Sequence, residues 1–364
     1  MSISVRTHKI AKIVNRRDFL RTAAGLAVAT NAAGCAPSLL TSRTGAAAST
    51  AMTASAIRAA ITEAYDKYKD VQDGANASYI PALAQAPRDL FGIAVVTTDG
   101  QVFEMGDTQS AFAIESISKV FSMALVIEEL GAQAVQSKVG ASPTGLPFNS
   151  VIAVELHNGQ PLSPLVNAGA MSTVSLLPAT TADERWGKLI DGYSRFAGRA
   201  LTLIDEVYQS EAATNFHNRG IAWLLYSYGT MYAEPMEACD VYTRQCSVAI
   251  TATDLATMGA TLAAGGVNPR TGQRIVAPNN VPPILAEMTM EGMYDASGDW
   301  AFTVGLPAKS GVGGGILAVA PGVLAISAFA PPLDAVGNSV KGALATAFIA
   351  NRLGLNVFAA KAAS

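Results

Sequence analysis

The stretch Ser116-Ile117-Ser118-Lys119 decides how the rest of this chain is interpreted, because it places a serine and a lysine three residues apart. Side chains at positions i and i+3 lie on one face of a helix, so the lysine amine can approach the serine hydroxyl. A serine becomes a good nucleophile only when a neighbouring group takes its proton. A helix N-terminus at this point would also stabilise developing negative charge. The motif therefore predicts an acyl-transfer site.

A second motif, Lys309-Ser310-Gly311, lies far downstream and precedes Val312 and the three glycines Gly313 to Gly315. Its order resembles the K-[ST]-G motif of serine penicillin-recognising enzymes. A strand that approaches a substrate with its backbone needs neighbours without side chains, and the glycines meet that need. A Gly-rich bulge or turn would contain the same glycines. The lysine and the pairing of the two motifs favour a functional role.

The charge balance argues against nucleic acid as a partner. The 364-residue chain carries 25 Lys and Arg and 28 Asp and Glu. Six of the basic side chains and only Asp18 lie in residues 1–35, so the remainder has 19 basic and 27 acidic side chains, a net charge of −8. Such an acidic balance provides no electrostatic footprint for nucleic acid.

Residues 1–35 are typical of an export signal, with Asn15-Arg16-Arg17-Asp18-Phe19-Leu20 in a basic stretch and an apolar run from Thr22 to Ala33. They resemble a bacterial twin-arginine signal, so we expect a periplasmic protein. The sequence that ends in Cys35 is similar to a lipobox, and the alternatives are a lipid anchor at Cys35 or cleavage near an Ala-x-Ala-like site. Residues 36–50 indicate a linker. No later segment has about eighteen uninterrupted apolar residues, so we expect no transmembrane helix.

The remaining residues, 51–360, are enough for one domain with a large core. Apolar periodicity and turn signals predict four helices and two hairpins. The helices run from Met52, from the serine motif to about Glu129, from a cap at Thr253 to Gly265-Gly266, and from Ser339 to Leu353. One hairpin joins Leu90 to Thr97 with Gln101 to Met105 around Asp99-Gly100, and the other joins Gly315 to Ala320 with Val323 to Phe329.

This order predicts an α+β fold. We expect strands from about 85–110 and 300–330 to join in one antiparallel sheet, and residues from about 140 to 300 to form a mostly helical lobe. The serine would then lie where the lobe meets the sheet, facing Lys309-Ser310-Gly311.

Several separated blocks resemble the serine-dependent glutaminase family, between about Tyr79 and Phe358. They are Tyr79-Ile80-Pro81, Phe112 to Phe121, Leu146 to Asn149, Asn167 to Ala170, Val207 to Glu211, Asn218-Arg219, Tyr242 with Gln245-Cys246-Ser247, Gly292 to Gly298, and Lys309 to Ile316. The resemblance implies the fold of serine β-lactamases and penicillin-binding proteins, with an antiparallel sheet flanked by helices and a mostly helical lobe. It also implies hydrolysis of L-glutamine to L-glutamate and ammonia, no metal or organic cofactor, and a homodimer or homotetramer.

The resemblance further implies roles at the reacting end of the substrate. Ser116 would attack the side-chain amide carbon while Lys119 takes its proton, and the backbone N–H groups of Ser116 and Val312 would hold the oxyanion. Tyr242 and Tyr294 match two tyrosines of the family. One of them would shuttle a proton, provided that lysine ammonium groups at 119 and 309 stabilise its phenolate.

The amino-acid end of glutamine needs a carboxylate for its ammonium group and neutral donors for its carboxylate. Glu211 and Asn218 fit this need and stand seven residues apart, two turns along one face if the stretch is helical. Asn167 and Tyr79 match further family contacts. Without the resemblance, Glu211 and Asn218 would be typical of a solvated helix face or a cap, and Asn167 of a turn.

Some positions depart from the family pattern. His217 stands where an arginine is usual, Ser163 replaces an asparagine, and Glu291 replaces a cysteine. None of them matches a substrate contact. We expect them to influence the pH profile and the affinity more than the reaction.

Other chemistries fit less well. A Ser-His-Asp hydrolase needs a histidine base, and outside residues 1–35 the chain offers only His157 and His217, too far apart for a metal site as well. Cys239 and Cys246 could pair, although separate buried thiols fit better. Two alternatives stay open: a β-lactam-recognising serine hydrolase, and an exported protein that binds glutamine without hydrolysing it.

Overall fold

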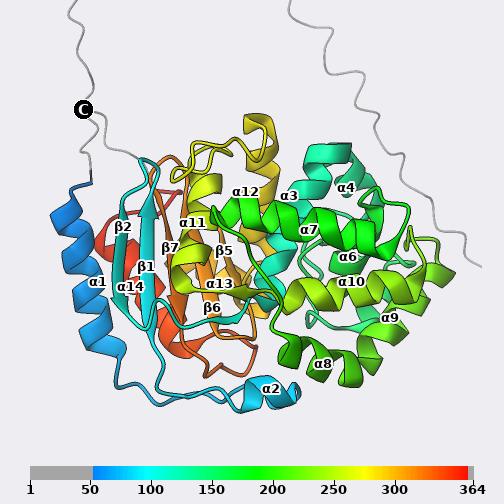
Figure 1. The fold of residues 1–364 in the computed structure, drawn as a ribbon, viewed down its shortest axis with the longest axis horizontal. Coiled ribbons are helices and arrows are strands. Elements are labelled where there is room, and N and C mark those ends of the chain that lie inside the picture. Colours follow the sequence, from blue (N-terminus) through cyan, green and yellow to red (C-terminus); the bar gives the residue numbers. More distant parts are fainter. Residues whose placement is uncertain (1–51, 360–364) are drawn as a thin grey trace, which may run out of the picture. The chain divides into compact units, whose positions relative to one another are not determined.

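The computed structural model of the chain describes residues 52–359, so the export signal and linker predicted for residues 1–50 lie outside the described residues. Figure 1 shows an antiparallel sheet flanked by helices, beside a lobe made of helices. The five strands run in the order β2-β1-β7-β6-β5. Their bounds are β1 Gly92–Thr97, β2 Val102–Gly106, β5 Ala308–Ser310, β6 Gly315–Ala320 and β7 Leu324–Phe329. The predicted α+β fold is confirmed.

The sheet joins the two ends of the described chain. β1 pairs with β2 on one side and with β7 on the other, and the register places Gly92 opposite Phe329. Both predicted hairpins are present, β1–β2 and β6–β7. Their turns contain Gly100 and Gly322, with φ of +87° and +76°, a left-handed conformation that glycine adopts without steric cost.

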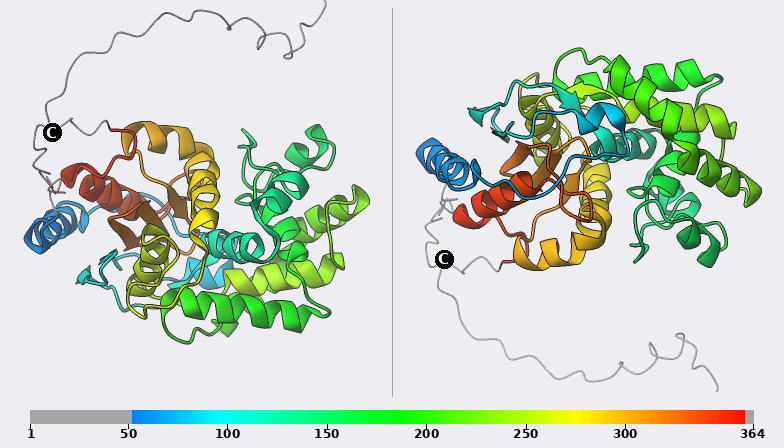
Figure 2. Two further views of the ribbon diagram at one scale, coloured as in Figure 1. Left: turned by 90° about the horizontal axis from the view of Figure 1, so that it is seen from above. Right: turned by 90° about the horizontal axis from the view of Figure 1, so that it is seen from below.

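Helices cover both faces of the sheet, so its inner strands are buried on both sides. Two of these helices, α1 (Ala54–Tyr68) and α14 (Val340–Arg352), pack together on one face, as both views in Figure 2 show. Alternate residues of β1 separate the two cores: Ile93 and Val95 face α1 and α14, whereas Ala94 and Val96 belong to the core on the other side. This alternation follows from the two-residue repeat of a strand.

The second face is covered by α11 (Ala252–Ala263), which contacts β1, β6 and β7. It falls within the 140–300 stretch expected to form the helical lobe, yet it packs on the sheet. Every one of its residues is buried there. Its predicted cap, Thr253, is wrong by two residues. The cap is Thr251, whose extended backbone lets its hydroxyl accept the Asp254 N–H (3.1 Å) while the Asp254 carboxylate accepts the Thr251 N–H (2.8 Å).

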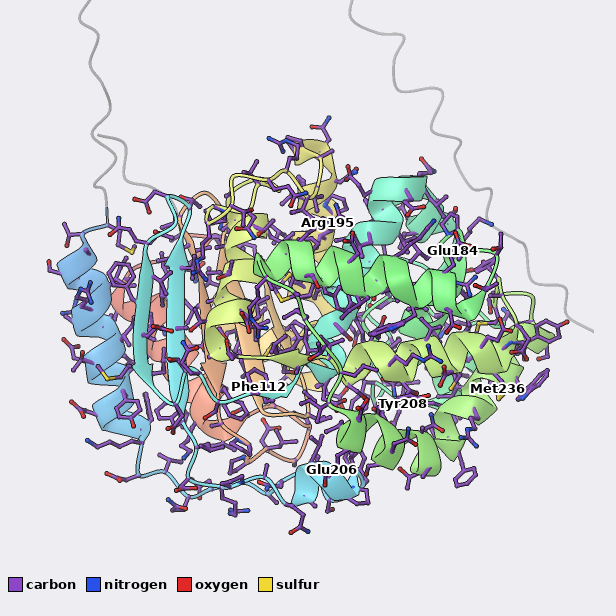
Figure 3. The ribbon with its side chains drawn as sticks, viewed as in Figure 1. Phe112, Glu184, Arg195, Glu206, Tyr208 and Met236 are labelled. Carbon is purple, nitrogen blue, oxygen red and sulfur yellow. The ribbon has the colours of Figure 1, made fainter. Side chains whose placement is uncertain are left out.

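The lobe is built around α3, α6 and α10, and α6 contacts both of the other two. Its helices are α3 Ser118–Leu130, α4 Ala132–Lys138, α5 Val151–Leu156, α6 Asn167–Leu176, α7 Ala182–Ala197, α8 Asp205–Thr214, α9 Phe216–Ser227 and α10 Pro235–Cys246. A short helix, α2 (Pro81–Ala84), contacts α8. Figure 3 labels Tyr208 of α8, whose hydroxyl donates to Asp240 of α10 at 2.6 Å.

Short elements fill the junction between lobe and sheet. They are β3 (Phe112–Ala113), β4 (Ala249–Ile250), α12 (Val281–Glu291), α13 (Ser297–Thr303), and the 3₁₀ turns η1 (Glu115–Ile117), η2 (Pro278–Asn280) and η3 (Tyr294–Ala296). The ring of Phe112, labelled in Figure 3, stacks on Phe329 of β7 at 4.1 Å between centroids. This contact fixes the segment that leads into the serine motif against the sheet. Within residues 52–359, no helix combines the length and hydropathy that a membrane crossing requires.

Candidate active site

Ser116 lies in the 3₁₀ turn η1, immediately before α3. It is buried, with 6% of its surface exposed. The preceding Glu115 has φ of +49°, which is unusual for a residue with a side chain and costs about 1–3 kcal/mol. The Ser118 hydroxyl donates to the Glu115 carbonyl at 2.6 Å and helps to hold this conformation. The turn therefore presents Ser116 in a fixed, strained geometry typical of functional sites.

The glycine segment after β5 packs against this turn. A Cβ on Gly313 would lie 2.2 Å from the Ala113 carbonyl oxygen, so only glycine permits the approach. Val312 is buried next to it. Among the described residues, neither the Ser116 nor the Val312 backbone N–H has a backbone acceptor. Two unpaired donors in a buried junction are the arrangement that an oxyanion requires.

Lys119 belongs to a hydrogen-bond network centred on Asn167. The Lys119 Nζ donates to Asn167 Oδ1 at 2.6 Å, and the Tyr242 hydroxyl donates to the same oxygen at 3.1 Å. Asn167 Nδ2 in turn donates to Asn218 Oδ1 at 3.0 Å. Among the described residues Lys119 donates to Asn167 and has no hydrogen bond to Ser116. The network nevertheless brings together four of the predicted site residues.

Tyr294 also lies near Ser116. It begins η3, has φ of +55°, and its hydroxyl donates to the Ser310 carbonyl at 3.3 Å. Lys309 supports it: the Nζ lies 4.0 Å from the ring centroid and donates to the carbonyls of Gly292 (3.0 Å) and Ser310 (2.8 Å). Lys309 thus connects the backbone of the segment that contains Tyr294, at Gly292, with the backbone of β5, at Ser310.

Burial dominates the protonation of these groups. It lowers the pKa of Lys119 to about 8, although carboxylates and Cys246 nearby oppose the shift. Burial, assisted by the charge of Lys119, lowers the pKa of Lys309 well below its ordinary value. The pKa values of Tyr242 and Tyr294 are both raised by burial, even though Ser116 and Ser310 partly offset the rise for Tyr294. The pKa values of both phenols are thus shifted upward, and stabilisation of a phenolate by the lysine ammonium groups stays a prediction.

Glu211 and Asn218 lie on different helices, not on one continuous face. The break at Asn215, with ψ of +31°, ends α8 and begins α9. Asn218 points to Asn167, whereas Glu211 is buried and its Oε2 has no hydrogen-bond partner among the described residues. Burial raises the pKa of Glu211 to about 7. The two side chains therefore reach the site from two directions.

Tyr79 lies at the rim of the same site. More than half of its surface, 59%, is exposed. Its hydroxyl is desolvated all the same: burial raises its pKa, and Tyr294, Glu115 and Glu211 add to the rise. Tyr79 is thus placed where a ring can face solvent while its hydroxyl faces the interior.

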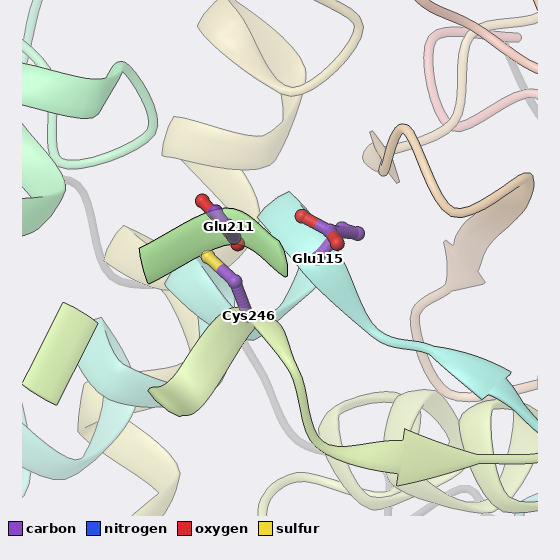
Figure 4. A group of neighbouring side chains, drawn as sticks. All are labelled: Glu115, Glu211 and Cys246. Carbon is purple, nitrogen blue, oxygen red and sulfur yellow. The ribbon is translucent and has the colours of Figure 1, made fainter. Parts of the chain in front are cut away.

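Two further residues of the site escaped the sequence interpretation. Glu115 and Cys246 lie beside Glu211, and the carboxylate oxygens and the sulfur are all within 4.8 Å of one another (Figure 4). Burial and the neighbouring Glu211 raise the pKa of Glu115 well above its ordinary value. Cys246 and Cys239 are both free thiols, as predicted. Cys246 was part of a family block, and Glu115 stands next to the serine, yet neither position by itself signals convergence with Glu211.

Glu291, at the end of α12, anchors the segment that covers the site. Its Oε2 accepts the Thr144 N–H at 2.7 Å. Four residues further along this segment, Phe148 packs against Tyr294 with centroids 4.6 Å apart, and its carbonyl accepts the Asn167 N–H at 2.8 Å. Burial raises the pKa of Glu291, and the charge of Lys309 partly offsets this rise.

We expect Glu291→Ala to destabilise the protein by about 1–3 kcal/mol, because it leaves the Thr144 N–H without an acceptor in a partly buried place. Glu291→Gln keeps an acceptor oxygen and should cost less. Thermal unfolding of both variants and the parent measures the difference. Equal melting temperatures for the alanine variant and the parent would mean that this bond does not anchor the segment.

These features define a class. An antiparallel sheet flanked by helices, with a helical lobe, is the α+β architecture of the serine β-lactamase-like fold, and the chain is similar to solved glutaminase structures. A probable glutaminase, ybaS, superposes with a TM-score of 0.83 at 58% identity, over 84% of this chain and 99% of that one. A probable glutaminase from Bacillus subtilis, solved with 6-diazo-5-oxo-L-norleucine, gives 0.74 at 30% identity, over 83% and 96%.

Sequence comparison agrees with the structural one. The family model described as Glutaminase matches residues 74–358. A glutaminase of Brucella canis is 66% identical over 303 residues, 83% of this chain and 96% of that protein. One of Desulfovibrio desulfuricans is 59% identical over 304 residues, 84% and 98% of the two chains. The chain belongs to the glutaminase family, and this membership supports hydrolysis of glutamine.

Proposed function

We propose that this enzyme hydrolyses the side-chain amide of L-glutamine through an acyl-enzyme formed on Ser116. The observation that carries the proposal is the position of Ser116: a buried hydroxyl on a strained turn, beside two backbone N–H groups without backbone acceptors. Each such donor is worth roughly 3–4 kcal/mol when it meets an oxyanion in a preorganised site.

In the first half of the reaction, the Ser116 oxygen attacks the amide carbon and its proton passes to the neutral amine of Lys119. The N–H groups of Ser116 and Val312 hold the negative oxygen that forms. The carbon–nitrogen bond then breaks and ammonia leaves with a proton. Tyr294 is our candidate for delivering that proton, because it lies near Ser116. The phenol gives its proton to the leaving nitrogen while it takes the proton that Lys119 carries. No phenolate accumulates, and Lys119 is neutral again for the second half.

In the second half, water takes the place vacated by ammonia. Lys119 accepts a proton from this water as it attacks the acyl carbon, and the bond to Ser116 breaks with return of a proton to the serine oxygen. Glutamate is released. The balance is one glutamine and one water consumed, one glutamate and one ammonia formed.

The amino-acid end of the substrate is proposed to bind on the lobe side. Glu211 would receive the ammonium group, because its Oε2 is buried without a partner. Asn218 and Asn167 supply side-chain donors for the carboxylate, and Tyr79 and Tyr242 offer hydroxyls near them. A buried acceptor that only an ammonium satisfies gives strong selection against analogues that lack it.

We expect Glu211→Gln to raise KM for L-glutamine by at least about 30-fold, since truncating one partner of a buried charge pair costs about 2–5 kcal/mol. The reacting end keeps Ser116 and Lys119, so kcat should change less than KM. Steady-state kinetics with L-glutamine separates the two. A variant with unchanged KM would show that the ammonium binds elsewhere.

The pH dependence follows from Lys119. Its amine must be neutral to accept a proton, and with a pKa of about 8 it becomes neutral as pH rises. We therefore expect kcat/KM to increase about tenfold per unit between pH 7 and 8 and to level off above pH 8. Below pH 7 the decrease should be steeper, because Glu211, whose pKa burial raises to about 7, also takes up a proton there. A profile of kcat/KM between pH 5.5 and about 9 checks this. A flat profile, or one that falls as pH rises, would contradict the role of Lys119.

The direct test of the function is ammonia release by the purified enzyme, with L-glutamine, L-asparagine and D-glutamine in parallel. Release from L-glutamine alone supports both the reaction and the proposed clamp. Equal release from D-glutamine would mean that Glu211 and Asn218 do not distinguish the configuration at the α-carbon. Binding of L-glutamine without ammonia would leave a binding protein as the better interpretation.

We also propose a homodimer or homotetramer. The neighbouring helices α5 and α9 expose Ile152, Leu156, Phe216, Trp223 and Tyr226, each with more than half of its surface accessible. Apolar side chains gathered in this way are typical of an interaction surface. Light scattering gives the mass in solution, and a monomer at all concentrations would contradict the proposal.

Periplasmic export through residues 1–35 remains part of the proposal, with Cys35 as a possible lipid anchor. Cell fractionation of the chain and of a variant with Arg16 and Arg17 changed to lysine tests the first point. Fatty-acid labelling tests the second, and a protein that stays in the cytoplasm unlabelled would contradict both.

A further inference from the structure

The acidic end of the pocket has the composition of a metal site as well as of an ammonium site. Glu115 comes from η1, Glu211 from α8 and Cys246 from the last turn of α10, and Figure 4 shows their functional groups turned toward one another. One carboxylate oxygen from each glutamate and the sulfur all lie within 4.8 Å of one another. Only 3% of Glu115, 8% of Glu211 and 1% of Cys246 is exposed.

The oxygens of this cluster lack partners. Glu115 Oε1 and Glu211 Oε2 are both buried and accept no hydrogen bond among the described residues. A buried carboxylate without a partner is costly, so the cluster favours any cation that enters it. We propose that Glu115, Glu211 and Cys246 bind Zn²⁺, and that the ion excludes the substrate by occupying the place of its ammonium group.

The ligand set selects the kind of cation. Thiolate sulfur and carboxylate oxygen together suit Zn²⁺, which binds them at about 2.3 Å and 2.0–2.2 Å, whereas Mg²⁺ and Ca²⁺ prefer oxygens only and more of them. Three protein ligands leave a fourth position for water. One carboxylate oxygen of each glutamate and the sulfur already converge within 4.8 Å of one another, which is the juxtaposition that a shared ion requires.

Zinc binding has a proton signature. A free thiol keeps its proton at neutral pH and must lose it to become a ligand. Entry of Zn²⁺ therefore releases protons. This distinguishes coordination in the cluster from loose attraction to surface carboxylates, which are already ionised at neutral pH.

The test measures both competition and binding. With ZnCl₂ at micromolar concentration in a non-chelating buffer, we expect the apparent KM for L-glutamine to rise while kcat is unchanged, and EDTA to reverse the effect. Calorimetric titration of ZnCl₂ in two buffers of different ionisation enthalpy should show proton release, and L-glutamate should displace the ion. The competition experiment rests on the proposed glutaminase activity, but the calorimetry does not, so failure of one proposal can be told from failure of the other.

Cys246→Ser and Cys239→Ser make a matched pair, because both thiols are buried, free and on α10, and only Cys246 joins the cluster. We expect Cys246→Ser to weaken Zn²⁺ binding by at least about tenfold and Cys239→Ser to leave it unchanged. Equal affinity in both variants, inhibition that is not competitive, or MgCl₂ acting as well as ZnCl₂ would overturn the site. If Cys246→Ser does not fold, the test uses the parent enzyme alone. Zinc that L-glutamate does not displace would then be bound elsewhere, which would overturn the site.

Discussion

Replacing Ser116 with alanine is expected to lower kcat by about 10³-fold to 10⁶-fold, the range seen when a catalytic serine is removed from an acyl-transfer enzyme. Two neighbouring hydroxyls of the described residues are poor substitutes, since burial raises the pKa of Tyr294 and the Ser118 hydroxyl donates to the Glu115 carbonyl. The backbone donors at Ser116 and Val312 survive the change, so substrate should still bind. Ammonia release and glutamine titration measure the two effects.

Ser118→Ala is the matched control, because both serines stand in the same motif within two residues of each other. It removes one hydrogen bond that holds the turn, worth about 0.5–1.5 kcal/mol, and leaves the nucleophile in place. We expect most activity to remain. If Ser118→Ala were the inactive variant and Ser116→Ala the active one, the motif would have been assigned to the wrong serine.

The second large effect is expected at Lys119. Lys119→Ala should lower kcat/KM by about 10²-fold to 10⁴-fold, which is the usual contribution of a positioned general base. Lys119→Arg should be nearly as inactive, because a guanidinium keeps its proton at any pH at which the enzyme is folded. The alanine variant should also lose the limb of the pH profile near 8. Circular dichroism checks that each variant keeps its helices.

The two substitutions at Lys119 separate proton transfer from charge. If Lys119→Arg retained most of the activity, the lysine would act as a fixed positive charge toward Asn167 and the oxyanion, and another group would take the serine proton. If both variants were inactive and addition of a small primary amine restored the alanine variant only, proton acceptance would be supported.

Much of the fold could be predicted because its signals are local. The Asp99-Gly100 and Pro321-Gly322 turns determine two hairpins, and apolar periodicity determines α1 and α14. The cap of α11 was misplaced although its signal is present: Thr251 is followed three residues later by Asp254, and only this pair can form the reciprocal hydrogen bonds of a capping box. Thr253, which is nearer the apolar run, is an equally suitable cap when the backbone conformation is unknown.

The site was predictable to a smaller degree, because family blocks name residues without giving their geometry. The network on Asn167 brings Lys119, Tyr242 and Asn218 together as the resemblance implied. The break at Asn215, which separates Glu211 from Asn218, follows from tertiary packing of α8 and α9 rather than from a Gly or Pro signal. The convergence of Glu115 and Cys246 on Glu211 depends on three elements distant in sequence, and no spacing rule anticipates it.

Burial also influences the protonation of the site in a way that sequence alone does not give. Sequence shows that lysines and tyrosines are present, and reference pKa values suggest ammonium groups that stabilise a phenolate. In the folded protein the same burial that brings them together removes water from all of them, so the amines lose protons more easily and the phenols keep theirs.

The pairing of β1 with β7 has a consequence for biosynthesis. The ribosome makes β1 long before its partner strand β7 and the Lys309 strand. A nascent chain that has not reached β7 thus lacks the central strands of its own sheet, and contacts this distant in sequence form slowly. Glutamine hydrolysis should begin only after these strands have been made. Chains truncated after Ala320 should show neither activity nor protease resistance; a protected fragment would indicate that the lobe folds first by itself.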